Sequence, residues 1–315
     1  MILQGVPRIL MRINYKDKSL IVITGPTAVG KTETCIRIAR KLHTGIVSAD
    51  ARQFYKELKI GTAAPTPSEL ARAKHYLTGH ISISDYYNVS LFEQQALKAL
   101  DEIFKKSDFA ILTGGSGLYI DTLCKGIDAM PDAIPKVRER VKQIYANEGL
   151  EGLRNLLRNV DAEYFDEVDT ANPNRMMRGL EVFYSTGKKF SDLRKKTSIQ
   201  RPFRIKRIIL NRPRHELNER INLRTNLMVQ HGLIEEAVKF FPVRHLNALN
   251  TVGYKELFAW IQNQWPLDTA IEKIRTHTRR YAKRQLTWFK RYDDAKWFLS
   301  EEENQILNYI QKERD

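Results

Sequence analysis

The sequence predicts an α/β fold in which a parallel sheet is flanked by helices and a helical segment is inserted between two of the strands. Short apolar runs alternate with amphipathic stretches over the first 124 residues, which is typical of a parallel sheet. A glycine-rich turn joins the first apolar run to the first amphipathic stretch, and residues 125–200 contain no convincing strand. We therefore expect a sheet-containing core, 1–124 with 201–315, and a helical insertion, 125–200.

The first half of the core contains three predicted strands and two predicted helices. Apolar residues at helical spacing define the first helix, and Ser90 with Glu93 has the spacing of a capping box that opens the second. In chain order the elements are strand Leu20–Thr24, helix Thr32–Leu42, strand Ile46–Val47, a helix from Ser90 to about Lys106, and strand Phe109–Thr113.

The second half begins with a change of pattern near Lys125. A Pro-containing segment, residues 130–135, leads into the charged helices of the insertion, and strand Ile205–Leu210 would return the chain to the core. Three predicted helices complete it: Arg214–His231, Thr251–Gln262 and Leu267–Arg291.

The charge balance favours a polyanionic partner. The 52 Lys and Arg residues exceed the 37 Asp and Glu residues by 15, and the pI is about 9.7, which favours nucleic acid. No apolar run reaches the roughly 18 residues that a membrane span needs, and the first 20 residues carry charges throughout. We expect a cytoplasmic protein without a membrane partner, and we expect Cys35 and Cys124, which lack zinc-ligand spacing, to be buried thiols.

Residues 25–32, Gly-Pro-Thr-Ala-Val-Gly-Lys-Thr, match the phosphate-binding loop pattern at every defined position. The loop follows a predicted strand and opens a predicted helix, so its backbone N–H groups would face one anion. Lys31 would add a point charge, and the Thr32 hydroxyl would bind Mg²⁺. The pattern makes the core P-loop NTPase-like, but it does not identify the phosphate ligand.

Asp50 is the acidic residue that could act beside this loop. An ordinary nucleotide hydrolase carries an acid at the end of a neighbouring strand, yet Phe109–Thr113 is followed by Gly114-Gly115-Ser116-Gly117. Asp50 follows strand Ile46–Val47, at the edge where open α/β sheets bind ligands. It could hold a metal ion, act as a base, or only cap the following turn.

An ordered series of motifs from about residue 20 to 300 resembles one family. The series consists of Gly25–Thr32, Ser48–Tyr55, Ile60–Ala63, Gly114–Tyr119, Asn172–Arg175 with Arg178, Arg220 with Arg224, and Tyr281–Trp288. In residue type, order and spacing these segments are similar to the bacterial-type tRNA dimethylallyltransferases, also called tRNA isopentenyltransferases.

The resemblance implies transfer of a dimethylallyl group from dimethylallyl diphosphate to N6 of adenine 37, next to the tRNA anticodon, with release of diphosphate. Asp50 matches the family's base, which would accept the N6 proton, while Ser116 and Arg220 match the other catalytic positions. The leaving diphosphate would be stabilised by the loop, by Mg²⁺ on Thr32 and by Arg220. The residues implied for diphosphate binding are Gly25, Thr27, Ala28, Gly30, Lys31 and Thr32.

The resemblance also implies contacts to a tRNA anticodon stem-loop. The insertion would grip the anticodon stem, and Gln53 would contact a base edge, although a polar loop residue is an equal interpretation of Gln53 without the family. Residues 270–292 hold eight Lys or Arg against one acid, and a second basic segment runs from Arg201 to Arg214. The predicted tRNA-binding residues are Gln53, Arg175 and Arg178 from the resemblance and Arg280, Lys283 and Arg284 from the charge pattern, and we expect a monomer.

Three residues beside the implied chemistry differ from the usual family pattern. Ala51 replaces a Ser, Ser116 replaces a Thr and keeps its hydroxyl, and Ala64 replaces a Lys. The changes at Ala51 and Ala64 remove a hydrogen-bonding group and a charge, so they are expected to alter affinity for a substrate rather than remove a catalytic group.

Two other classes of protein fit the phosphate loop. A small-molecule kinase would use the same loop and sheet but has little need for 15 surplus positive charges. A P-loop RNA-binding switch would bind nucleotide and RNA and leave both unchanged. Incubation with an anticodon stem-loop and dimethylallyl diphosphate separates the three classes.

Overall fold

The computed structural model describes residues 14–195 and 198–312. It contains two compact units: residues up to 124 together with those from 201 onward form the larger unit, and residues 125–200 form the smaller one. The larger unit is built on a six-stranded sheet in the order β3-β2-β4-β1-β5-β6, in which every pair of neighbours is parallel. The predicted α/β fold is therefore confirmed.

The central strands bury both of their faces, as expected of a parallel sheet covered by helices. All six residues of β1 are buried; Leu20 and Val22 face one cluster of core residues, whereas Ile21 and Ile23 face another. The strands are β1 Ser19–Thr24, β2 Ile46–Ser48, β3 His75–Tyr76, β4 Phe109–Gly114, β5 Arg204–Asn211 and β6 Lys296–Leu299.

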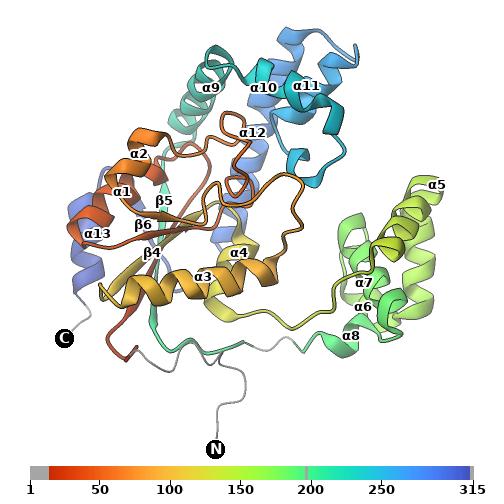
Figure 1. Ribbon diagram of the computed structural model, residues 1–315, viewed down its shortest axis with the longest axis horizontal. Coiled ribbons are helices and arrows are strands. Elements are labelled where there is room, and N and C mark those ends of the chain that lie inside the picture. Colours follow the sequence, from red (N-terminus) through yellow and green to blue (C-terminus); the bar gives the residue numbers. More distant parts are fainter. Residues whose placement is uncertain (1–13, 196–197, 313–315) are drawn as a thin grey trace, which may run out of the picture. The chain divides into compact units, whose positions relative to one another are not determined.

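Helices pack on both faces of the sheet (Figure 1). α1 and α13 cover the face with Ile21, while α3 and α4 cover the face with Leu20. The helices of the larger unit are α1 Lys31–Lys41, α2 Pro67–Arg72, α3 Val89–Phe104, α4 Gly117–Lys125, α9 Arg214–Gln230, α10 Leu233–Phe240, α11 Tyr254–Ile261, α12 Leu267–Phe289 and α13 Glu303–Gln311, with short 3₁₀ turns at Phe241–Val243 and Asn247–Leu249.

The smaller unit is helical, with α5 Pro135–Val160, α6 Ala162–Glu167, α7 Pro173–Thr186 and α8 Phe190–Leu193. α5 is broken at Gly149, where φ is 64°. The helices close over a core of their own that includes Leu153, Tyr164, Met176 and Leu180. The unit can thus hold its shape without a strand.

Two predicted helix starts are wrong. The helix predicted from Ser90 is α3, which is capped by Asn88: the Asn88 side chain accepts from the backbone N–H of Leu91, so Ser90 lies inside the first turn and forms no capping box. The helix predicted from Thr251 begins at Tyr254, because Gly253 has a φ of 101°, which no helical residue adopts. Both starts depend on backbone geometry that apolar spacing does not report.

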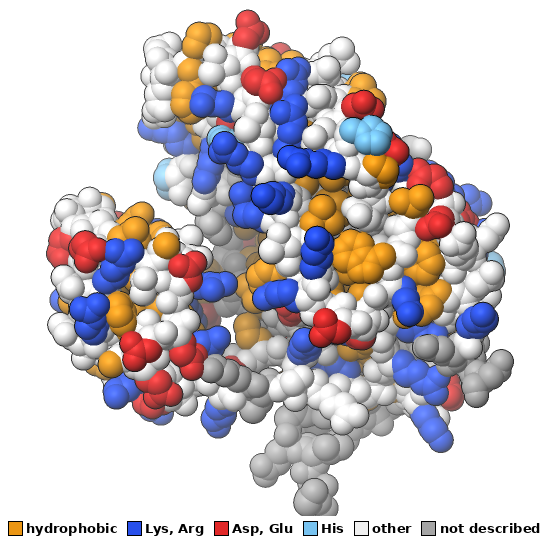
Figure 2. Space-filling model, turned by 180° about the vertical axis from the view of Figure 1, so that it is seen from behind, with side chains coloured by type: hydrophobic (Ala, Val, Ile, Leu, Met, Phe, Trp, Pro, Cys, Tyr) orange, Lys and Arg blue, Asp and Glu red, His pale blue; other side chains and the backbone are white. Residues whose placement is uncertain are grey.

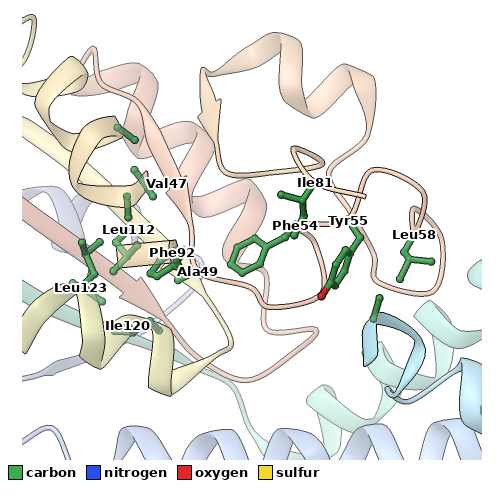
Figure 3. Packing of buried hydrophobic residues seen from close by; sticks show 14 of the residues in the cluster. Val47, Ala49, Phe54, Tyr55, Leu58, Ile81, Phe92, Leu112, Ile120 and Leu123 are labelled. Atoms are coloured by element: carbon green, nitrogen blue, oxygen red, sulfur yellow. The ribbon is translucent and has the colours of Figure 1, made fainter. Parts of the chain in front are cut away.

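The loop after β2 is anchored in the core, which fixes the position of Asp50 (Figure 3). Phe54 is 1% exposed, and its ring stacks on Phe92 of α3 with 5.7 Å between the ring centroids. Leu58, further along the loop, is fully buried. Asp50 therefore lies on a segment that is packed into the core, just after the end of β2.

Candidate active site

The phosphate-binding loop joins the end of β1 to α1. Gly25 has a φ of 150°, and a Cβ at this position would collide with the backbone carbonyl oxygen of Leu210, so only glycine fits. Gly30 caps α1 and has no side chain to accept from the first backbone N–H groups of the helix. Those N–H groups and the positive end of the helix dipole can therefore serve an anion.

Lys31 and Arg220 both donate to carbonyl oxygens of this loop. The Lys31 amine lies 3.0 Å from the oxygen of Gly25 and 2.8 Å from that of Pro26, and the Arg220 Nε lies 2.7 Å from that of Ala28. Burial lowers the pKa of Lys31 to about 8, although the nearby Asp50 charge opposes that shift. Both cations therefore contact the loop that would bind the phosphates.

Two cavities meet at the loop. The outer cavity, about 920 Å³, is lined by Lys31, Thr32 and Arg220 among others, and the inner cavity, about 80 Å³, is lined by Lys31, Thr32 and Asp50 among others. Arg224 lines both. The implied diphosphate-binding residues that line the inner cavity are Thr27, Ala28, Gly30, Lys31 and Thr32, while Gly25 supports the turn behind them.

Arg224 is a functional candidate that received no role from the sequence. It follows Arg220 by one helical turn on α9, and its Nη1 lies 3.3 Å from the Thr27 hydroxyl. Burial lowers its pKa, and the charge of Arg220 lowers it further. The spacing of four residues was the signal available in the sequence, since such residues share a helix face.

Asp50 fills one of the roles left open by the sequence, that of a turn cap, and it also lines two cavities. Its Oδ1 accepts from the backbone N–H of Arg52 at 3.0 Å, so it does cap the following turn. It also lines the inner cavity and a linking cavity of about 120 Å³, which shares Thr27, Arg224 and Tyr281 with the inner one. A turn-capping carboxylate with a second oxygen near a cavity can still accept a proton or bind a metal ion.

Ser116 and Gln53 support the loops on either side of Asp50. The Ser116 hydroxyl accepts from the backbone N–H of Ala51 at 3.0 Å, directly beside Asp50. The Gln53 amide nitrogen donates to the carbonyl oxygens of Thr62 and Ala63 at 3.2 and 2.9 Å. Ser116 therefore contacts the backbone of Ala51, and the amide oxygen of Gln53 takes no part in the two contacts to Thr62 and Ala63.

Glu236 on α10 holds the next loop and was not singled out in the sequence. Its carboxylate accepts from the backbone N–H groups of Lys59, Ile60 and Gly61 at 2.8 to 3.1 Å, and from the Tyr254 hydroxyl at 2.6 Å. This loop supplies Thr62 to both the inner and the linking cavity. No local sequence pattern links residue 236 with residues 59–61.

Arg280 and Arg284 on α12 line a basic cavity of about 600 Å³, together with Arg52, Ser116, Lys255 and Tyr281 among others. Lys283 is exposed and is not part of this cavity. Arg275 and Arg279 are engaged with Asn226, Asn222 and Glu272 instead. Figure 2 shows one face on which Lys and Arg side chains gather in a band on the larger unit.

The second basic segment predicted from Arg201 to Arg214 is largely internal. Arg201 contacts Glu93 and two backbone carbonyls, and Lys206 is buried against the carbonyl oxygen of Ile310. Arg207 pairs with Asp294, and Arg212 with Glu216 and Glu301. These cations stabilise the fold, so the prediction of a phosphate-binding surface there is wrong for them.

The smaller unit carries the remaining two implied tRNA contacts. Arg175 is exposed at the start of α7. Arg178, one turn later, donates to the carbonyl oxygen of Pro131 at 2.8 Å and lies 3.8 Å from Glu181. Arg175 is therefore freer than Arg178 to contact a phosphate.

A model of the IPP transferase family matches residues 53–292. The chain belongs to the IPP transferase family. A tRNA dimethylallyltransferase 1 from Bacteroides thetaiotaomicron is 48% identical to this IPP transferase over 292 residues, which cover 93% of the chain and 95% of the relative. A tRNA dimethylallyltransferase from Christiangramia forsetii is 46% identical over 293 residues, covering 93% and 97%.

Solved structures of the family share the fold. A tRNA isopentenylpyrophosphate transferase from Bacillus halodurans superposes with a TM-score of 0.68 at 30% identity, covering 93% of this chain and 95% of that one. A eukaryotic dimethylallyltransferase that acts on tRNA gives a TM-score of 0.73 at 25% identity, covering 94% and 77%. This family member has no helix that could cross a membrane in its described residues.

Proposed function

We propose that this IPP transferase transfers a dimethylallyl group from dimethylallyl diphosphate to N6 of adenine 37, beside the anticodon of tRNA, and releases diphosphate. The observation that carries the proposal is the position of Asp50. Its carboxylate lines the inner cavity at the phosphate loop and the linking cavity, which in turn shares Arg52, Thr251, Val252 and Tyr281 with the basic cavity. An acid at this junction can serve a reaction between a diphosphate and an RNA base.

The reaction is a displacement at the allylic carbon. The lone pair of N6 forms the new C–N bond, the C–O bond to diphosphate breaks with its electrons on oxygen, and Asp50 accepts the N6 proton. The amine is a weak nucleophile because its lone pair is delocalised into the purine ring, so removal of the proton lowers the barrier. The loop N–H groups, Lys31, Arg220 and Arg224 stabilise the charge that accumulates on the leaving group.

The residues at the loop fit a Mg²⁺ ion. Thr32 and Asp50, which carry a hydroxyl and a carboxylate, both line the inner cavity. Mg²⁺ is commonly held by one or two protein oxygens together with substrate phosphates and water. When bound by Thr32 and the donor, the ion would neutralise charge on the diphosphate.

The basic cavity is the proposed entrance for the RNA. Arg280 and Arg284 would contact backbone phosphates, which position an RNA without specifying a sequence. Adenine 37 must leave the base stack to reach Asp50, at a cost of a few kcal/mol, and a single-stranded loop keeps that cost low.

Transfer can be tested with a synthetic anticodon stem-loop and dimethylallyl diphosphate. We expect a product heavier by one dimethylallyl group on adenine 37 and an equal amount of diphosphate. Transfer of a phosphoryl group from ATP would reject the proposal in favour of a kinase. Binding of both substrates without a product would reject it in favour of a binding switch.

A further inference from the structure

Tyr281 lies at the meeting point of the proposed substrate spaces. It lines the inner cavity with Asp50 and Gln285, the linking cavity with Asp50 and Arg224, and the basic cavity with Arg280. Among the described residues, no other side chain lines all three. Tyr281 therefore lines every one of the spaces between the basic cavity and Asp50.

Tyr281 and Gln285, the residue one turn later on α12, both line the inner cavity. The Gln285 amide nitrogen donates to the carbonyl oxygen of Gly115 at 2.9 Å, and its amide oxygen accepts from the backbone N–H of Thr27 at 2.8 Å. A phenol hydroxyl both donates and accepts, so the Tyr281 hydroxyl can donate its proton to an acceptor in these cavities. Burial raises the pKa of Tyr281, and the Asp50 charge raises it further, so the hydroxyl keeps that proton.

A donor next to an acceptor matches the amine edge of adenine. N6 of adenine carries protons, and the neighbouring N1 is an acceptor, whereas guanine carries an acceptor at O6 and a proton on N1. Enzymes that act on a base outside the stack recognise it by hydrogen bonds to this Watson–Crick edge. Asp50 supplies the acceptor, and Tyr281 supplies the donor.

We propose that the Tyr281 hydroxyl donates to N1 of the acceptor adenine while Asp50 accepts from N6, so that the pair selects adenine and orients its amine. This inference rests on the proposed function. It makes Tyr281 a specificity-determining residue, and it explains why guanine would be refused: the Asp50 carboxylate would face the O6 oxygen, and two acceptors cannot share a hydrogen bond.

The test combines Tyr281→Phe with stem-loops that carry adenine, 1-deazaadenine or 7-deazaadenine at the acceptor position. For adenine, we expect Tyr281→Phe to lower kcat/KM by about 10- to 100-fold, the loss typical of one unpaired hydrogen-bonding group in a closed site. Replacing adenine with 1-deazaadenine, which lacks N1, should lower the kcat/KM of the wild type by a similar factor. The same replacement should lower the kcat/KM of Tyr281→Phe little further. The KM for dimethylallyl diphosphate should stay unchanged.

A matched control is Tyr292→Phe, which removes another buried hydroxyl, bonded to Asp121 at 2.7 Å, outside the three cavities. It should leave the preference between adenine and 1-deazaadenine unchanged. If 1-deazaadenine lowered kcat/KM by the same factor in the wild type and in Tyr281→Phe, the N1 assignment would be wrong. It would also be wrong if the effect of Tyr281→Phe depended on 7-deazaadenine instead of 1-deazaadenine. Absence of any transfer by the wild type would reject the proposed function itself.

Discussion

The side chain of Gln285 accepts a hydrogen bond from the backbone N–H of Thr27 at 2.8 Å, although the two residues lie 258 positions apart. The same side chain donates to the carbonyl oxygen of Gly115 at 2.9 Å and is 5% exposed. One buried amide thus ties the phosphate loop, the turn after β4 and the helix with Arg280 and Arg284 together. The proposed donor site and the proposed RNA entrance are therefore joined by this one side chain.

Gln285→Met keeps the volume of the side chain and removes both hydrogen bonds. We expect the free energy of unfolding to fall by about 1–3 kcal/mol, because the Thr27 N–H and the Gly115 carbonyl are left without partners. We also expect the KM for dimethylallyl diphosphate to rise, since the phosphate loop loses the hydrogen bond between Thr27 and Gln285. Denaturant unfolding and steady-state kinetics check the two effects, with the exposed Gln305→Met as control. A variant with normal kinetics would show that this hydrogen bond is not needed for donor binding.

Lys31→Ala should weaken binding of dimethylallyl diphosphate and lower the transfer rate, each by well over tenfold, because the leaving group loses a buried point charge. tRNA binding should persist, since Lys31 does not line the basic cavity. Calorimetry with each substrate separates the two. Inorganic pyrophosphate should compete with the donor in the wild type, and failure to compete would argue against a diphosphate at the loop.

The pKa of Lys31, lowered to about 8, predicts a pH dependence of donor binding. Below pH 8 the amine is charged and attracts the donor, whose phosphates are already ionised; above pH 8 it loses its proton. The affinity for dimethylallyl diphosphate should therefore decrease as pH rises through about 8. Lys31→Arg, which stays charged, should remove this pH dependence even if it binds more weakly. An affinity that rises with pH in the wild type would contradict the assignment.

The affinity for tRNA should fall steeply as salt increases, because phosphate contacts release counterions. Reversing the charges of Arg280 and Arg284 to Glu should flatten the plot of log affinity against log salt. The matched control reverses the charges of Lys98, which lies in α3, and Lys106, which lies just after it. Both lysines are exposed and line none of the cavities described above. Equal slopes for the wild type and the Arg280/Arg284 variant would remove this face of α12 from the RNA interface.

Local patterns were sufficient to predict the strands and the loop that build the donor side. The apolar run of β1, the glycines of Gly25–Thr32 and the position of Asp50 after β2 each lie within a few residues of the feature that they create. The edge strands β3 and β6 were missed because two and four residues are too short for a recognisable period.

The positioning contacts could not be predicted in the same way. Gln285 reaches Thr27, and Glu236 reaches Gly61, across separations that leave no periodicity in the sequence. The basic segment around Arg207 misled for the related reason that charge composition does not distinguish an internal ion pair from a phosphate contact. Such contacts follow from tertiary packing alone.

Asp50 is the residue on which the proposed mechanism depends most, and Asp50→Asn tests it with little change in size. If Asp50 is the base, the variant should bind donor and RNA normally, yet transfer should fall by about 10²–10⁴-fold, the contribution typical of a general base. If Asp50 mainly holds Mg²⁺, the variant should lose Mg²⁺-dependent donor affinity, and raised Mg²⁺ should partly restore it.

The deciding measurement is single-turnover transfer to an anticodon stem-loop by Asp50→Asn, with donor and RNA binding measured on the same preparation. We predict a loss of transfer by about 10²–10⁴-fold with both binding constants preserved. Transfer at a rate near that of the wild type would contradict the role of Asp50 as base and as metal ligand, and with it the proposed mechanism.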